Sequence, residues 1–113
     1  MFHDTYKYDS LDIAKYIVAK ANKEKYGINM TKMQKLLYIV YGVYLRVYNE
    51  RLTNEHPQAW PYGPVFPKTR NKLLKADLYS ITKTDVCDEL QKDKKVAQVV
   101  DFVFSIFGSW NAG

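Results

Sequence analysis

The sequence predicts a mostly α-helical protein: a compact single-domain bundle of four or five helices, with room for one short β-hairpin or edge strand. Three observations lead to this prediction. The chain has 113 residues, which suits one domain. Hydrophobic residues make up 47% of it, enough for a packed core. The apolar residues of its longest segments recur at helical spacing.

The first helix is expected from about residue 11 to residue 25. Asp9 or Ser10 precedes this segment, and either side chain is suited to cap the first turn. Gly27 follows at the position of a C-terminal cap. The apolar face expected to enter the core consists of Leu11, Ala14, Ile17, Val18 and Ala21.

The second helix has the clearest signals. Thr31 is expected to cap its start, with Gln34 reaching back as in a capping box. One broad apolar face follows, made of Met33, Leu36, Leu37, Val40, Val43, Tyr44 and Val47. A second stripe lies opposite, made of Gln34, Tyr38, Gly42, Leu45 and Asn49. A glycine inside a helix costs about 1 kcal/mol relative to alanine, so another backbone or ring is expected to approach Gly42. The stripe is either a second packing face or a partner groove.

Residues 59–67, AWPYGPVFP, contain the PxxP pattern twice. A ligand of proline-recognition domains is extended and exposed, whereas this stretch lies between two predicted helices. It is therefore predicted to be a rigid corner. Pro61 keeps the preceding residue extended. Gly63 supplies a conformation that other residues avoid, Pro64 restricts it, and Pro67 begins the next helix.

The remaining elements are shorter. A connector over residues 52–60 has room for a short strand. A third helix over residues 67–76 combines an apolar side (Leu73, Leu74) with a basic one (Lys68, Arg70, Lys72, Lys75). Residues 78–81 suggest an edge strand, and Asp85 is expected to cap a turn that runs to residue 90. The last helix is expected over residues 94–107, ended by Gly108, with a core face of Val96, Val99, Val100, Val103 and Phe107.

No pattern in the sequence predicts catalysis, a cofactor or a metal site. The nitrogen and thiol ligands considered are His3, His56 and Cys87, which are not paired at metal-ligand spacing. Cys87 has acidic neighbours that do not activate a thiol, so it is expected to be a small buried or half-buried side chain. Nucleophile-elbow and phosphate-loop motifs are also missing. The sequence therefore favours a protein that is not an enzyme.

The composition favours a cytoplasmic protein with a protein partner. One cysteine allows no intrachain disulfide, the first ten residues lack the apolar run of a signal peptide, and the apolar stretch over residues 96–107 is shorter than the about 20 residues that span a bilayer. The net charge of +5 biases the surface mildly toward acidic partners. Ten tyrosines suggest half-buried surfaces or an interface.

Two motifs together resemble a known family. TKMQKLLYIVYGVYL contains Thr31 followed by Leu36, Leu37 and Tyr38, and AWPYGPVFP follows after a connector. This combination resembles the Panacea domain of SocA-like antitoxins, which is also met in prophage-associated proteins. SIFGSWNAG at the end is similar to the family's small-residue turn. The chain departs from the pattern at Gln58, where an acid often stands, and at Gly113, beyond which family members often continue.

The resemblance implies a mostly α-helical binding protein that neutralises a cognate toxin by direct contact, or delivers a target to a protease as an adaptor. A homodimer is also open. Trp, Tyr and Arg are the usual anchors of binding energy, so the partner is expected to meet Trp60, Tyr62, Phe66, Arg70, Tyr38 and Leu45. The alternative for Trp60 and Phe66 is that they fill the core. Two other functions stay open: a nucleic-acid-binding regulator that uses the basic helix, and a phage-encoded inhibitor of a host protein.

Overall fold

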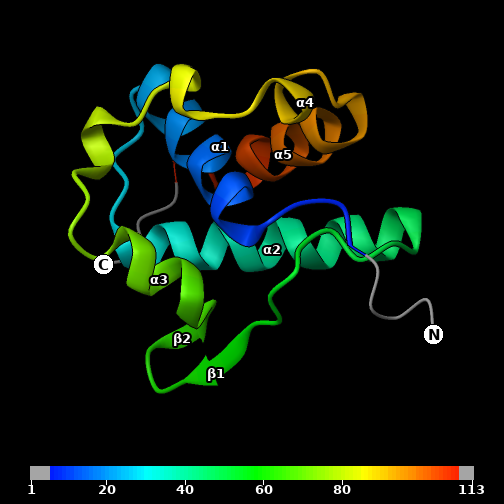
Figure 1. The fold of residues 1–113 in the computed structure, drawn as a ribbon, viewed down its shortest axis with the longest axis horizontal. Coiled ribbons are helices and arrows are strands. Elements are labelled where there is room, and N and C mark those ends of the chain that lie inside the picture. Colours follow the sequence, from blue (N-terminus) through cyan, green and yellow to red (C-terminus); the bar gives the residue numbers. More distant parts are fainter. Residues whose placement is uncertain (1–5, 110–113) are drawn as a thin grey trace.

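The longest helix, α2 (Met30–Tyr48), is the centre of the fold in the computed structural model, which describes residues 6–109. It lies across the molecule with α1 and α5 on one side and a β-hairpin on the other (Figure 1). The other elements are α1 (Ser10–Lys23), β1 (Gln58–Trp60), β2 (Gly63–Val65), α3 (Pro67–Leu73), the 3₁₀ turns η2 (Leu78–Ser80) and η3 (Lys83–Asp85), α4 (Asp88–Gln91) and α5 (Lys94–Phe107). The predicted fold class is confirmed.

The start of α1 follows the prediction, but its end does not. Asp9 caps the helix, because its side chain accepts a hydrogen bond of 2.8 Å from the Leu11 N–H. The helix ends at Lys23, and Lys25 takes the left-handed conformation with φ of 62°. Gly27 is therefore not the C-terminal cap. The chain reverses earlier because the Tyr26 N–H bonds back to the Ala21 carbonyl, which brings the Tyr26 ring against Phe104.

The start of α2 differs from the predicted capping box. Asn29 is the cap, and its side chain accepts a hydrogen bond from the Lys32 N–H. Thr31 lies inside the first turn, so it is not the cap. Gln34 does not reach back to the helix start; its side-chain oxygen bonds to the β-hairpin segment instead.

The core face of α2 is narrower than predicted. Met33, Leu36, Leu37, Val40 and Tyr44 are fully buried. Val43 is only partly buried, and 60% of Val47 is exposed. The core face of α5 is confirmed for its four valines, but Phe104 is buried where Phe107 was expected, and Phe107 is half-buried. Helix α5 has the predicted bounds, and Gly108 follows it as the C-cap.

Lys32 is buried and joins two distant turns. Its Nζ donates to the Gly27 carbonyl at 3.0 Å and to the Gly108 carbonyl at 2.6 Å, and it lies over the Tyr26 ring. Burial lowers the pKa of this amine. The two carbonyls compensate for the lost water contacts, so Lys32 fixes the α1–α2 turn to the C-terminal end of α5.

From the end of α3 to the start of α5, the structure differs from the prediction at three points. Helix α3 ends at Leu73, and Leu74 is 53% exposed rather than part of the apolar side. The expected edge strand is the 3₁₀ turn η2, because Asn22 of α1 donates to the carbonyls of Leu78 and Ile81 and holds the turn closed. Asp85 accepts from the Thr82 N–H within η3 and does not cap α4.

A buried carboxylate joins the first helix, the connector and α3. Glu55 accepts hydrogen bonds from the Ser10 hydroxyl (2.8 Å), the Thr69 hydroxyl (3.0 Å) and the Thr69 N–H (3.2 Å). The Lys68 N–H also donates to it. Phe66, at the N-cap position of α3, has no capping side-chain bond, so Glu55 supplies this cap from a distant part of the chain.

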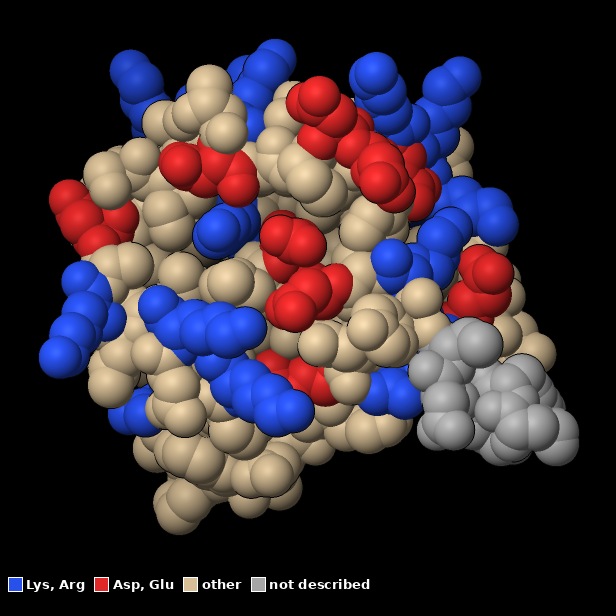
Figure 2. Space-filling model, viewed as in Figure 1, with Lys and Arg blue, Asp and Glu red and all other residues tan. Residues whose placement is uncertain are grey.

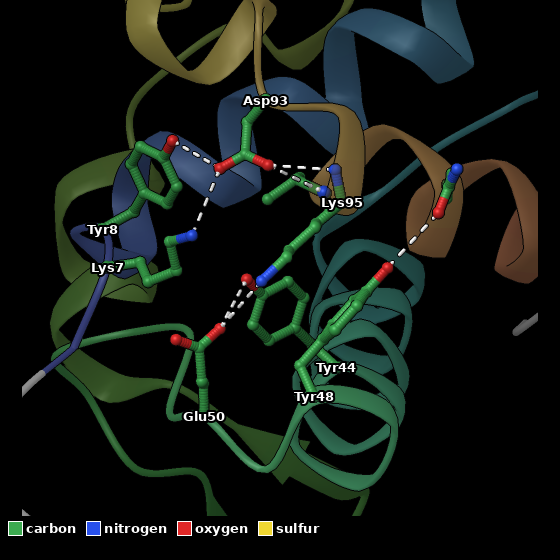
Figure 3. Close-up of polar contacts among 9 residues, drawn as sticks. Lys7, Tyr8, Tyr44, Tyr48, Glu50, Asp93 and Lys95 are labelled. Carbon is green, nitrogen blue, oxygen red and sulfur yellow. Dashed lines mark hydrogen bonds and ion pairs between the residues drawn. The ribbon is translucent and has the colours of Figure 1, made fainter.

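A second carboxylate, that of Asp93, links Lys7 and Tyr8 near the N-terminus to α5 (Figure 3). Asp93 caps α5 through the N–H groups of Lys95 and Val96, and its other oxygen accepts from the Tyr8 hydroxyl at 2.8 Å and lies 3.7 Å from the Lys7 amine. Burial opposes its charge, but these contacts outweigh burial and lower the pKa of Asp93. Below it, Glu50 faces Tyr44 and Lys95 (Figure 3).

We expect Glu55→Ala to lower the free energy of unfolding by about 2–4 kcal/mol, since it leaves several buried donors without an acceptor. Urea unfolding followed by circular dichroism measures this. Glu89→Ala removes an exposed carboxylate and is the matched control, with an expected change below about 0.5 kcal/mol. Equal effects of the two substitutions would contradict the role of Glu55.

We expect Asp93→Asn to lower the free energy of unfolding at pH 7 by about 1 kcal/mol, because Asn keeps the cap but loses the charge. The pKa of Asp93 is lower in the native protein than its value of 3.8 in the unfolded chain. The ionised carboxylate therefore contributes its full stabilisation above pH 3.8, and this contribution is lost as the pH falls through the native pKa. The difference between the wild-type protein and the variant should therefore shrink below about pH 4. Urea midpoints at pH 7 and pH 3 test this; a constant difference would refute it.

Candidate protein-binding surface

The segment 58–65 forms an antiparallel β-hairpin. Gln58 pairs with Val65 and Trp60 with Gly63, which leaves Pro61 and Tyr62 as a two-residue connection. Proline fits the second position of such a turn and glycine the fourth. Gly63 has φ of +126°, as its predicted role requires. Pro67 begins α3, also as predicted. The prolines therefore belong to a hairpin and a helix start, as a rigid corner requires, and not to an extended PxxP ligand.

Phe66 anchors the hairpin and cannot contact a partner. Its side chain is fully buried, and its ring packs edge-on against Tyr41 at 5.8 Å. Its N–H donates to the Gln34 side-chain oxygen at 2.7 Å, and Gln34 is itself 3% exposed. The prediction that Phe66 lies on the contact surface is thus wrong, and the alternative that it fills the core holds for this residue.

Trp60, Tyr62 and Arg70 come together on the outside of the hairpin. The Trp60 and Tyr62 rings meet edge to face with centroids 5.9 Å apart, and the Arg70 guanidinium lies 5.5 Å from the Trp60 ring centroid. Tyr62 is 51% exposed, whereas Trp60 and Arg70 are half-buried. Trp60 is therefore not a core residue. The structure brings three of the predicted contact residues into one cluster, here called the hairpin cluster.

Tyr38 and Leu45 lie on α2, the helix that β2 packs against, and they are 46% and 41% exposed. Gly42 is exposed between them in sequence, and a Cβ at this position would have no neighbour within 4 Å. The expected close approach to Gly42 is therefore wrong. The second stripe of α2 is divided: Gln34 is buried beneath the hairpin, while Tyr38, Gly42 and Leu45 form an open strip.

The surface around the hairpin has two electrostatic zones. In Figure 2, the lower end of the face, where the hairpin lies, shows neither basic nor acidic side chains. Lys and Arg side chains gather just above it, over α3 (Figure 2). An aromatic area with a basic border is suited to a protein partner that offers apolar side chains and carboxylates.

Residues of the types that act in catalysis or bind metal ions are scattered over residues 6–109. Residues 6–109 contain no group of three His, Cys, Asp or Glu side chains that would hold a metal ion. His56 Nδ1 lies 3.0 Å from the Tyr41 hydroxyl. Cys87 is exposed, so the expectation of a buried or half-buried thiol is wrong; it precedes α4 at the surface. His3 lies outside the described residues. No helix within residues 6–109 is long and apolar enough to cross a bilayer.

Sequence reasoning missed the residues that hold the surface in place. The sequence predicts no role for Glu55, because a lone glutamate in a connector gives no signal of a remote helix cap. For Gln34 it predicts only a bond within its own helix. The only sequence hint for Glu55 is that Pro67 starts a helix whose first N–H groups need an acceptor that Phe66 cannot supply.

These features define a class: a small helical domain that presents an aromatic hairpin on its surface. Comparison with known families makes the assignment more specific. Residues 33–113 match the model of the family described as antitoxin SocA-like, Panacea domain, so the chain belongs to that family. Comparisons with curated proteins and with solved structures gave no match.

Two glycines of this surface should respond oppositely to alanine. Gly63→Ala forces a side chain into φ of +126°, and we expect it to cost about 1–3 kcal/mol of unfolding free energy. Gly42→Ala has open space in a helix interior, so a gain of up to about 1 kcal/mol is expected. Thermal and urea unfolding of both variants measure this; stabilisation by Gly63→Ala would contradict the hairpin geometry.

Proposed function

We propose that this protein is an antitoxin that neutralises a cognate toxin by direct binding, without turnover of a substrate. Membership of the SocA-like antitoxin family is the observation that carries the proposal. The hairpin cluster supports it, because Trp60, Tyr62 and Arg70 combine the residue types that most often dominate binding energy. The cytoplasm is the compartment that fits a lone exposed thiol.

The toxin is proposed to cover the hairpin cluster and the open strip of Tyr38 and Leu45. Trp60 is already held by Tyr62 and Arg70, so little conformational entropy is lost when a partner packs on it. The hairpin is anchored through Gln34 and Phe66, which makes the surface preorganised. An adaptor that delivers the target to a protease, or an inhibitor of a host protein, would use the same kind of surface.

A nucleic-acid-binding regulator is the second candidate. Lys68 and Lys72 on α3 and Lys75 just after it favour this candidate, since all three are exposed. Arg70 weakens it, because its guanidinium lies over the Trp60 ring. Binding to DNA or RNA would fall steeply with salt concentration through counterion release. A mobility-shift assay without a complex at low salt removes this candidate.

We expect Tyr62→Ala to weaken toxin binding by about tenfold or more, the loss typical of an exposed aromatic anchor, while the melting temperature stays near that of the wild-type protein. The toxin candidate is the product of the neighbouring reading frame, co-expressed and co-purified, with the affinity measured by calorimetry and neutralisation by growth rescue. Phe102→Ala is the control, since Phe102 is a similarly exposed aromatic residue on α5. Absence of a complex and of rescue with the wild-type protein would refute the proposed function.

A further inference from the structure

A cleft of about 770 Å³ lies between the C-terminal half of α1 and the segment 79–91. Its buried lining includes Ala19, Ile81 and Val86, and its exposed rim includes Lys23, Lys83 and Tyr79. In Figure 1, the end of α1 and the turns facing it lie at the edge of the molecule opposite the hairpin. The cleft is therefore separate from the hairpin cluster.

Side-chain hydrogen bonds hold the wall of the cleft in shape. Asn22 donates from Nδ2 to the carbonyls of Leu78 and Ile81, each at 2.8 Å. Gln91 donates from Nε2 to the carbonyls of Lys83 (2.9 Å) and Val86 (2.7 Å). Because these backbone carbonyls already accept hydrogen bonds, the wall is preorganised and does not have to become ordered when a ligand binds.

The lining of the cleft holds three lysines, Lys20, Lys23 and Lys83, against one carboxylate, Glu24. Lys20 is neutralised, because its amine lies 2.5 Å from Glu24 and 2.8 Å from Asp101. Lys23 and Lys83 have no ion pair with any carboxylate of residues 6–109. Two free amines above an apolar floor favour a ligand that has both negative charge and an apolar group.

We propose that this cleft binds an acidic peptide segment of a protein partner, with an apolar side chain on the floor and carboxylates beside Lys23 and Lys83. Tyr79, 69% exposed, would cover the apolar side chain. A peptide fits better than a phosphate ligand, because the lining offers apolar surface and amines but no glycine-rich loop of backbone N–H groups. The proposal does not depend on the role of the hairpin.

The test is a titration of the ¹⁵N-labelled full chain with the peptide Ac-Glu-Glu-Leu-Asp-Leu-Glu-Glu-NH₂, followed by NMR. We expect saturable shifts of amides within residues 16–24 and 79–91 at peptide concentrations below those that cause any shift at the hairpin. The variant Lys23→Gln/Lys83→Gln should weaken binding by about tenfold, as loss of two charged contacts predicts. Tyr79→Ala should weaken it as well.

Lys72→Gln/Lys75→Gln removes the same charge from exposed positions in the last turn of α3 and just beyond it, and is the matched control. We expect it to bind the peptide as the wild-type protein does. The same peptide with lysine in place of each acid should cause no shifts. Equal weakening by both double variants, shifts at the hairpin that saturate before those in the cleft, or binding at Lys23 and Lys83 by a single-stranded oligonucleotide but not by the peptide would overturn the proposal. The outcome of the peptide titration does not depend on whether hairpin substitutions weaken toxin binding.

Discussion

The Glu55 carboxylate is the constraint on which the arrangement of this protein depends. It is 8% exposed and accepts hydrogen bonds from Ser10 at the start of α1 and from Lys68 and Thr69 at the start of α3. A buried charge is tolerated only when donors surround it. The three segments must therefore meet at one point, and this meeting fixes where the connector ends and where the hairpin begins.

The Gln34–Phe66 hydrogen bond then divides the aromatic segment into core and surface. Once the Phe66 N–H bonds to α2, the Phe66 ring enters the core beside Tyr41. The hairpin, which ends one residue earlier, is directed outward with Trp60 and Tyr62 on it. A short hairpin has little stability by itself, so its rigidity comes from this anchor and from the contacts of Trp60 with Arg70.

Two surfaces of different chemistry result from this arrangement. The hairpin cluster is aromatic and bordered by the basic residues of α3, whereas the cleft beside α1 is apolar at its floor and basic at its rim. The β-hairpin and the end of α1, which lines the cleft, lie at opposite edges of the molecule (Figure 1). A small protein with two such surfaces would be able to hold two segments of one partner, or two partners, without competition between them.

The sequence by itself determined the helices whose signals are local. The helix start at Asp9, one of the two caps predicted, the bounds of α5, Pro67 as a helix start and the left-handed region at Gly63 all depend on neighbouring residues, and all are confirmed. Family membership was also readable, because the two motifs are contiguous stretches. For the candidate surface, Trp60, Tyr62 and Arg70 were predicted and do lie together.

Only the tertiary structure decided which polar side chains act at a distance. Thr31 and Gln34 fit a capping box locally, but Asn29 caps the helix and Gln34 satisfies a buried N–H across 32 positions of the chain. Leu78, Tyr79 and Ile81 suggest a short edge strand, but Asn22 holds this segment as a 3₁₀ turn. In each case the local preference is worth only about 1 kcal/mol. It yields because leaving a buried polar group unpaired costs more. Which buried groups need a partner is set by contacts between residues far apart in the chain.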